Sequence, residues 1–130
     1  MRLLVDTHVL LWAIAEPRKL PKASRAKLEA GENDVLFSAA SIWELAIKLQ
    51  LGRLKLPVEL DTLTEAAKLM GFSELPVTAA HAAGVRHLPL YHRDPFDRLL
   101  VAQAIYEPAR FLTVDPVLSQ YTHWVETIKV

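Results

Sequence analysis

Residues 1–14, MRLLVDTHVLLWAI, place three polar side chains between two apolar runs. The first run lies in a predicted strand over 2–5, and its continuous apolar character is typical of strands buried in parallel sheets. The second run predicts a helix over 9–15 that ends before Pro17. Because a carboxylate inside a core is costly, we interpret Asp6 as the point where a buried strand reaches a functional surface.

Short apolar runs and helical patterns continue to alternate along the chain. Further strands are predicted over 35–38, 75–77, 110–113 and 125–130, and helices over 21–30, 39–50, 60–70, 79–85, 95–106 and 116–120. Strands that alternate with helices favour a parallel sheet covered on both faces. We therefore predict an α/β fold, a three-layer α/β/α sandwich with a central parallel sheet. No linker, repeat or low-complexity segment is visible, so residues 1–130 are predicted to form a single domain.

The composition limits the class of protein. Apolar residues make up 52% of the chain, which is enough for a core, and the absence of cysteine excludes disulfides and thiolate metal sites. Neither a long apolar run nor a signal-peptide pattern is present, so we expect a soluble cytoplasmic protein without membrane contact. The formal net charge is zero. This balance argues against a protein that coats nucleic acid, but not against an enzyme that binds it at one site.

Four acidic residues follow the predicted strands at corresponding places. Asp6 comes directly after the first strand, and Asp115 comes just after the fourth. Glu44 lies in the first turns of a helix that follows the second strand, and Asp97 lies in the first turn of the helix over 95–106. Active sites of open parallel sheets lie beyond the carboxyl ends of the strands. We therefore predict that the four carboxylates meet at that edge, Asp97 on the condition that its helix begins there.

Each acid also has a structural interpretation that the residues alone leave open. Helix caps, the helix dipole and ion pairs account for most of them. Asp6 is harder to interpret as a cap, because Thr7 is the more natural cap of the first helix. The other structural interpretations are an N-cap at Asp94 before Pro95, Asp97 as the third helical residue, a cap of the same form at Asp115–Pro116, a capping box from Ser41 to Glu44, and an ion pair of Glu44 with Lys48.

Clustered carboxylates repel one another and raise one another's pKa, so such a cluster needs a cation. Oxygen ligands suit Mg²⁺ or Mn²⁺, and a divalent cation held by carboxylates suits phosphate chemistry with one or two ions. Motifs for a nucleotide cradle, a serine nucleophile elbow or a cysteine nucleophile are absent. The histidines show no ligand spacing and are interpreted mostly as surface or packing residues: His8, His81, His87, His92 and His123.

Four segments carry these acids. They are VDTHVLLWA at 5–13, SAASIWELAIKLQLGRLKLP at 38–57, HRDPFDRLLVAQA at 92–104, and FLTVDPVLSQY at 111–121. In order and spacing they closely resemble the PIN-domain ribonucleases, specifically the VapC toxins of type II toxin–antitoxin systems. A single segment is a weak signal, but the set of four is specific, and the resemblance covers essentially the whole chain.

The resemblance implies a PIN-like fold and a Mg²⁺- or Mn²⁺-dependent endoribonuclease that leaves a 5′-phosphate and a 3′-hydroxyl. The family's hydroxyl residue falls on Thr7, and Asp94 matches a recurrent acid that supports the site. The catalytic and metal-binding acids of the family fall on Asp6, Glu44, Asp97 and Asp115. The resemblance also implies a small cognate antitoxin that blocks the site, a homodimer, and binding of promoter DNA only through the antitoxin.

RNA affinity in a chain of zero net charge depends on local basic residues. The candidates to bind the RNA backbone are Lys48, Arg53, Lys55, Arg93 and Arg98. Arg93 and Arg98 fit a solvated helix face equally well. Because unpaired bases are the accessible targets in RNA, a loop of a structured RNA is the preferred substrate.

Two other functions also fit an acid after the first strand. An Asp-dependent phosphotransfer or phosphatase protein uses such an acid as its nucleophile, but the dehalogenase-like pattern needs a second Asp two residues later, where this chain has His8. A non-catalytic PIN-like interaction module predicts a broken set of acids, and here the set is intact.

Overall fold

Five strands form one sheet in the computed structural model, which describes residues 1–130. Each neighbouring pair is parallel. The strands are β1 Arg2–Val5, β2 Asp34–Ser38, β3 Ser73–Leu75, β4 Arg110–Thr113 and β5 Val125–Thr127, in the spatial order β3-β2-β1-β4-β5. The predicted parallel sheet is confirmed, and β1, the strand of the opening segment, lies at its centre.

Helices connect the strands, and their bounds lie within two residues of those predicted. The α-helices are α1 Thr7–Ala15, α2 Lys22–Glu29, α3 Ala39–Gln50, α4 Leu60–Leu69, α5 Ala79–Gly84 and α6 Pro95–Tyr106, and the 3-10 helices are η1 Pro17–Lys19, η2 Val85–His87 and η3 Pro116–Gln120. The pattern predicted neither η1 nor η2. None of the helices is both long and apolar enough to span a bilayer.

β2 begins one residue earlier than predicted, and β3 and β5 end before the last residues of the strands predicted over 75–77 and 125–130. β2 ends at Ser38, where α3 begins, and β3 pairs with it only up to that residue. β5 likewise pairs with β4 only up to Thr113, the last residue of β4. A strand continues only while its neighbour offers backbone groups for hydrogen bonding. Beyond these points the strand pairing stops, and the last backbone hydrogen bond at β4 is the one that Ile128 donates to the Thr113 carbonyl at 2.7 Å.

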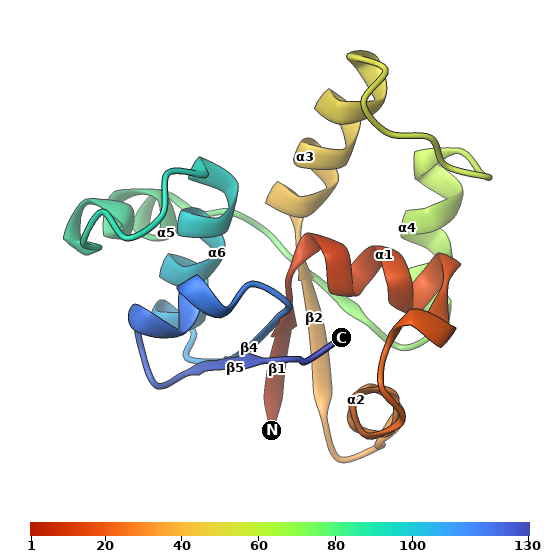
Figure 1. Ribbon diagram of the computed structural model, residues 1–130, viewed down its shortest axis with the longest axis horizontal. Coiled ribbons are helices and arrows are strands. Elements are labelled where there is room, and N and C mark those ends of the chain that lie inside the picture. The colour runs from red at the N-terminus through yellow and green to blue at the C-terminus, as the bar shows by residue number, and fades with distance from the viewer.

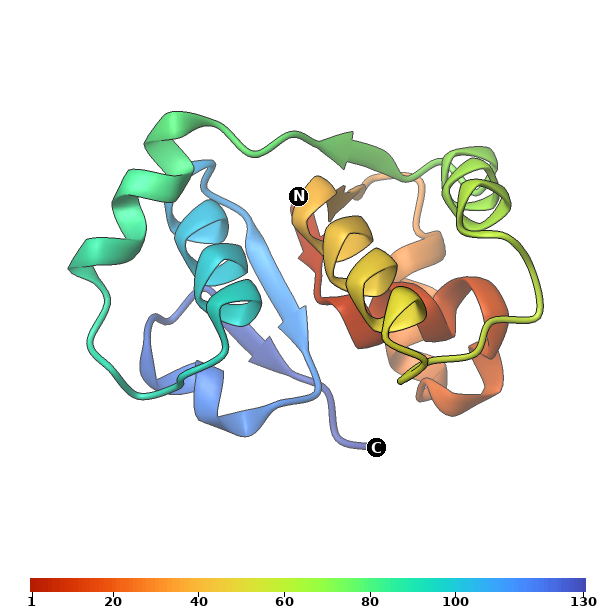
Figure 2. The same cartoon turned by 90° about the horizontal axis from the view of Figure 1, so that it is seen from above.

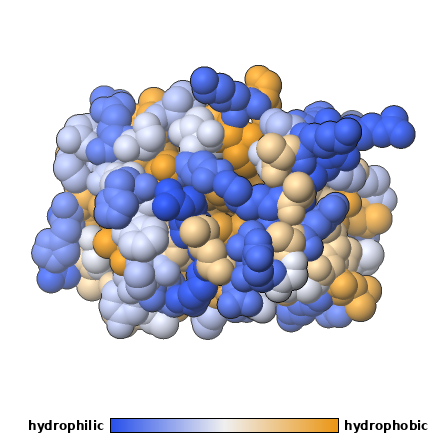
Figure 3. All heavy atoms as spheres, turned by 90° about the horizontal axis from the view of Figure 1, so that it is seen from below, coloured by the Kyte–Doolittle hydropathy of each residue, from blue (hydrophilic) through white to orange (hydrophobic).

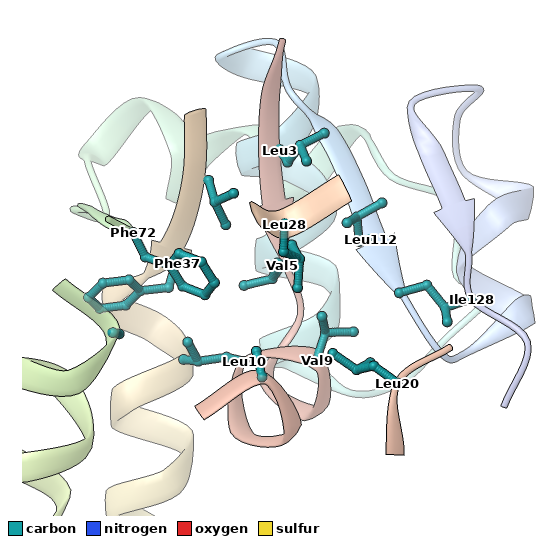
Figure 4. Packing of buried hydrophobic residues seen from close by; sticks show 13 residues of the cluster. Leu3, Val5, Val9, Leu10, Leu20, Leu28, Phe37, Phe72, Leu112 and Ile128 are labelled. Carbon is teal, nitrogen blue, oxygen red and sulfur yellow. The ribbon is translucent and has the colours of Figure 1, made fainter. Parts of the chain in front are cut away.

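Helices cover both faces of the sheet. Because successive strand residues point to opposite faces, Leu3 and Val5 join a core with α1, α2 and α4 (Figure 4), whereas Leu4 joins a second core with α6. All three side chains are fully buried. The ribbon views show α1, α2 and α4 gathered on one side and α5 and α6 on the other (Figures 1 and 2). The predicted three-layer α/β/α sandwich is confirmed.

The carboxyl ends of the strands meet at one edge of the sheet, which faces upward in Figure 1, where α1 and α3 leave β1 and β2. α6 runs in the opposite direction. Glu107, the residue after α6, contacts Arg2 at the amino end of β1. Since α6 ends at the amino edge of the sheet, it begins at the carboxyl edge. The condition on Asp97 is thereby met. The opposite face of the molecule carries mostly hydrophilic side chains around scattered apolar patches (Figure 3).

Candidate active site

Asp6 caps α1 and is tied to β4 at the same time. Its Oδ1 accepts from the Val9 backbone N–H at 2.7 Å, and its Oδ2 accepts from Thr113 Oγ1 at 2.6 Å and from the Val114 N–H at 3.2 Å. The expectation that Thr7 is the more natural cap was wrong, because the helix begins at Thr7 and the preceding residue has the extended backbone of a cap. Asp6 is only 4% exposed.

Glu44 lies in the second turn of α3 and faces the start of α1. Thr7 Oγ1 donates to Glu44 Oε1 at 2.7 Å and lies 3.0 Å from Ser41 Oγ. The predicted ion pair is present, with Lys48 Nζ 2.7 Å from Glu44 Oε2. The predicted capping box is wrong. Ser38 caps α3 instead, which leaves Ser41 and Glu44 free to contact α1.

Asp94 is the N-cap of α6, as predicted. Its Oδ1 accepts from the backbone N–H groups two and three residues later, at 2.8 and 3.5 Å. Pro95 occupies the first helical position, where its missing N–H costs nothing. The cap sets the direction of the first turn of α6 and thereby places Asp97.

Asp97 lies among the other acids, and the causes of its raised pKa show how they are placed. Burial, the largest cause, and the charges of Asp94, Asp6 and Glu44 together raise the pKa of its carboxyl to about 7, whereas His92 acts in the opposite direction. A carboxyl at this pKa is about half charged at neutral pH. Asp97 of α6 is therefore close enough to Asp6, which follows β1, and to Glu44 of α3 for their charges to affect its pKa.

Asp115 completes the group from the end of β4. Its Oδ1 accepts from the Val117 N–H at 3.0 Å, which confirms the predicted cap, and its Oδ2 lies 2.9 Å from His92 Nε2. The same His92 nitrogen is 3.7 Å from Asp97 Oδ2. Potential ligand atoms of these three residues lie within 4.8 Å of one another. The interpretation of His92 as a surface or packing residue was wrong, and only its position two residues before Asp94 could have pointed to it.

Arg98 is buried and turned away from the acids. Its guanidinium donates to the carbonyl of Pro89 at 2.8 Å, to the Tyr121 hydroxyl at 3.1 Å, and to the carbonyls of Val85 and Leu88 at 3.3 and 3.4 Å. Both sequence interpretations, a phosphate contact and a solvated helix face, were wrong. A guanidinium with this many carbonyl partners fixes the chain segment ahead of α6.

The remaining basic candidates differ in their surroundings. Lys48 is the one Lys or Arg that forms a salt bridge with one of these acids. Arg93 is exposed directly before Asp94, and Arg53 and Lys55 are exposed in the segment that follows α3. The carboxylates therefore outnumber the cations that neutralise them.

The donor set fits a hard divalent cation. Burial raises the pKa of the Asp6 carboxyl, although the hydrogen bonds from Thr113, Val9 and Val114 act against the shift. Two acids with raised pKa values, gathered with two more carboxylates, are stabilised in their charged form by a bound cation. Carboxylate oxygens are the ligands that Mg²⁺ and Mn²⁺ prefer.

Comparisons with known proteins agree with this geometry. A family model described as PIN domain matches residues 3–123. The chain is 32% identical over 125 residues to the protein named Ribonuclease VapC22 of Mycobacterium tuberculosis (strain ATCC 25618 / H37Rv), and the match covers 92% of each chain.

Two solved structures have the same fold. The crystal structure of VapBC2 from Rickettsia felis, bound to a DNA fragment from their promoter, matches with a TM-score of 0.71 at 16% identity, covering 99% of this chain and all of that one. The crystal structure of FitAcB from Neisseria gonorrhoeae matches with a TM-score of 0.58 at 22% identity and covers 89% of each chain.

Proposed function

The chain belongs to the PIN domain family, and from this premise we propose that it is a VapC-like endoribonuclease toxin that uses Mg²⁺ or Mn²⁺. The single observation that carries the proposal is the convergence of Asp6, Glu44, Asp97 and Asp115 at the carboxyl edge of the sheet. The raised pKa of Asp97 supports a site in which negative charge exceeds positive charge. The name of the Mycobacterium tuberculosis relative supports RNA as the substrate.

Each residue has a role in the proposed reaction. When bound, the cation supplies a nucleophilic water at neutral pH and neutralises charge on the scissile phosphodiester. Asp6 and Asp97 hold the cation, and Glu44 and Asp115 complete the acidic pocket, either as further ligands of the cation or by orienting the attacking water. Thr7 positions Glu44 through its 2.7 Å hydrogen bond. In-line attack by water leaves a 5′-phosphate and a 3′-hydroxyl, the polarity expected of the family.

The hydrogen bonds of Asp6 disfavour the phosphotransfer alternative. Both oxygens of its carboxylate accept hydrogen bonds, and the side chain is buried. A carboxylate nucleophile must itself reach the phosphorus atom, which the burial of Asp6 hinders, whereas a cation needs only the lone pair of Oδ1 that no protein donor uses. The intact set of acids likewise disfavours the interaction module.

The substrate is proposed to be a single-stranded loop of a structured RNA, because unpaired bases are accessible there. Lys48, Arg53, Lys55 and Arg93 are the proposed contacts to its backbone. Arg98 is left out because carbonyl groups and a hydroxyl take up its guanidinium.

We further propose a small cognate antitoxin as the partner that blocks the site, with the toxin itself a homodimer of single PIN domains acting in the cytoplasm. The VapBC2 structure is described as bound to a promoter fragment. This description supports a complex of the present chain that reaches promoter DNA through the antitoxin.

The test is to map RNA cleavage ends made by the purified chain with Mg²⁺, with Mn²⁺ and with a chelator. We expect new 5′-phosphate ends that require the cation and that disappear with Asp97→Asn. Asp34→Asn is the matched control, because Asp34 is an exposed acid at the opposite end of β2. Cleavage by Asp97→Asn at the rate of the unmodified chain contradicts the proposal.

A further inference from the structure

His92 contacts two of the proposed metal ligands from the segment just ahead of α6. Its Nε2 is 2.9 Å from Asp115 Oδ2 and 3.7 Å from Asp97 Oδ2. The ring is about one-fifth exposed, so solvent reaches it only in part. Two roles fit this position. The imidazole is either a nitrogen ligand of the cation or a hydrogen-bond donor to the carboxylates that hold it.

The second ring nitrogen decides between the two roles. The backbone N–H of Asp94 donates to His92 Nδ1 at 3.0 Å. A nitrogen that accepts a hydrogen bond presents its lone pair, so the proton of the neutral ring lies on Nε2. A histidine that ligates a metal does the reverse, since it donates from the nitrogen that does not bind the metal. The Asp94 N–H therefore makes Nε2 a donor.

The backbone that carries the ring is held in place as well. The His92 backbone N–H donates to the Tyr121 hydroxyl at 2.9 Å, and the same hydroxyl accepts from Arg98 at 3.1 Å. Tyr121 follows η3, and Arg98 belongs to α6. The backbone of His92 is thus attached to Tyr121 next to η3, and the same hydroxyl links it to α6.

We propose that His92 is a positioning residue that donates its Nε2–H to Asp115 and so holds this carboxylate in place for the cation. The inference rests on the proposed function of the site. Hydrogen-bond partners of metal ligands typically change metal affinity by about 10–100-fold when they are removed. Neither the number of acids nor their spacing in the sequence points to this contribution.

The experiment measures Mn²⁺ binding to the full chain by calorimetry, with no RNA present. We expect His92→Ala to weaken Mn²⁺ binding by about tenfold or more. We expect His92→Gln, whose amide can donate from nearly the same place, to recover most of that loss. His87→Ala is the matched control and leaves the affinity unchanged, because His87 is an exposed histidine of η2. Thermal unfolding of the metal-free variants verifies that each is folded.

Two further measurements separate positioning from ligation. Pulsed electron paramagnetic resonance of bound Mn²⁺ is expected to lack the coupling of a directly coordinated imidazole nitrogen. His92→Ala introduced together with Asp115→Asn is expected to cost less than the sum of the two single changes, because both remove one interaction. A coordinated nitrogen signal, full additivity, or unchanged affinity in His92→Ala overturns the inference while the proposed function stands. If the unmodified chain binds no Mn²⁺, the proposed function fails, and the inference fails with it.

Discussion

The two edges of the sheet each place a carboxylate against a histidine, with opposite electrostatic results. At the amino edge, Glu107 Oε1 lies 3.0 Å from Arg2 Nη2, and its Oε2 lies 2.6 Å from His81 Nε2. The hydrogen bond from His81 is the main cause of a lowered pKa for the Glu107 carboxyl, with Arg2 adding to it. At the carboxyl edge, burial and the neighbouring carboxylates raise the pKa of Asp97 to about 7.

The histidines themselves are held in the same way. His81 Nδ1 accepts from the Thr78 backbone N–H at 3.0 Å, as His92 Nδ1 accepts from that of Asp94, so each ring donates from Nε2. The difference lies in the balance of charge around them. One carboxylate receives two donors at the amino edge, whereas at the other edge several carboxylates share Lys48 and one histidine. The first arrangement stabilises the fold, and the second costs stability until a cation binds.

Substitutions at the two edges should differ most in their effect on RNA cleavage. We expect Asp6→Asn to lower RNA cleavage by about 10³-fold or more, the size expected when several kcal/mol of charge stabilisation is removed from the transition state. Asparagine is itself a good N-cap, so α1 should remain in place. Glu107→Gln should cleave at a rate within about twofold of the unmodified chain, since it alters no group at the carboxyl edge. Initial rates on one defined RNA give the comparison, and equal losses in both variants contradict it.

Stability should respond with opposite signs at the two edges. We expect Glu107→Gln to lower the free energy of unfolding by about 1–3 kcal/mol, because it weakens a partly buried pair and leaves its donors poorly matched. Asp97→Asn should raise that energy by about 1–3 kcal/mol in the metal-free protein at pH 8, because it removes a charge that burial and its neighbours disfavour. Urea unfolding with a chelator present measures both. Saturating Mg²⁺ should reverse the advantage of Asp97→Asn, since the cation stabilises only the chain that binds it.

The pH dependence of unfolding should also differ in sign. The folded pKa of Asp97 is raised from 3.8 to about 7, so the fold holds this proton more tightly than the unfolded chain. Its contribution is therefore greatest at low pH and is lost as the pH rises from about 4 to about 7. The lowered pKa of Glu107 contributes stability above its ordinary value of 4.5, which is lost as the pH falls through the folded pKa.

Metal-free urea titrations between about pH 3 and pH 8 resolve the two effects. Asp97→Asn should flatten the upper part of the profile, and Glu107→Gln should flatten the lower part. The Asp97 assignment is contradicted if the upper part keeps its slope in Asp97→Asn.

The smallest expected effects lie outside both edges. Removing Arg53 or Lys55 should weaken binding of single-stranded RNA only a few-fold and should reduce the dependence of log Kd on log salt by about one unit or less. Fluorescence anisotropy between about 50 and 200 mM salt measures this slope. Lys68→Ala is the control, because Lys68 lies on α4 and pairs with Glu74. If the dependence of log Kd on log salt is the same for all three variants and the unmodified chain, Arg53 and Lys55 do not contact the RNA backbone.

Local features of the sequence were enough for the elements and for several caps. The helix over 95–106 was predicted with its observed bounds, and Asp94 and Asp115 cap as expected. Capping signals and periodicity depend on a few neighbouring residues, so they can be recognised in the sequence without the tertiary structure. The same local signals misled the prediction at Ser41, which fits a capping box in the sequence although Ser38 is the N-cap of α3 in the structure.

The sequence by itself determined the parallel sheet, the edge at which the acids end, and the order of the segments that carry them. Only the tertiary structure decided that Asp6 caps α1 while it also binds Thr113, that Arg98 turns inward, and that His92 reaches Asp115. These contacts join residues up to 107 positions apart. Pairing of this kind depends on how strands and helices pack, because hydrogen bonds form between groups brought within about 3 Å, whatever their separation along the chain.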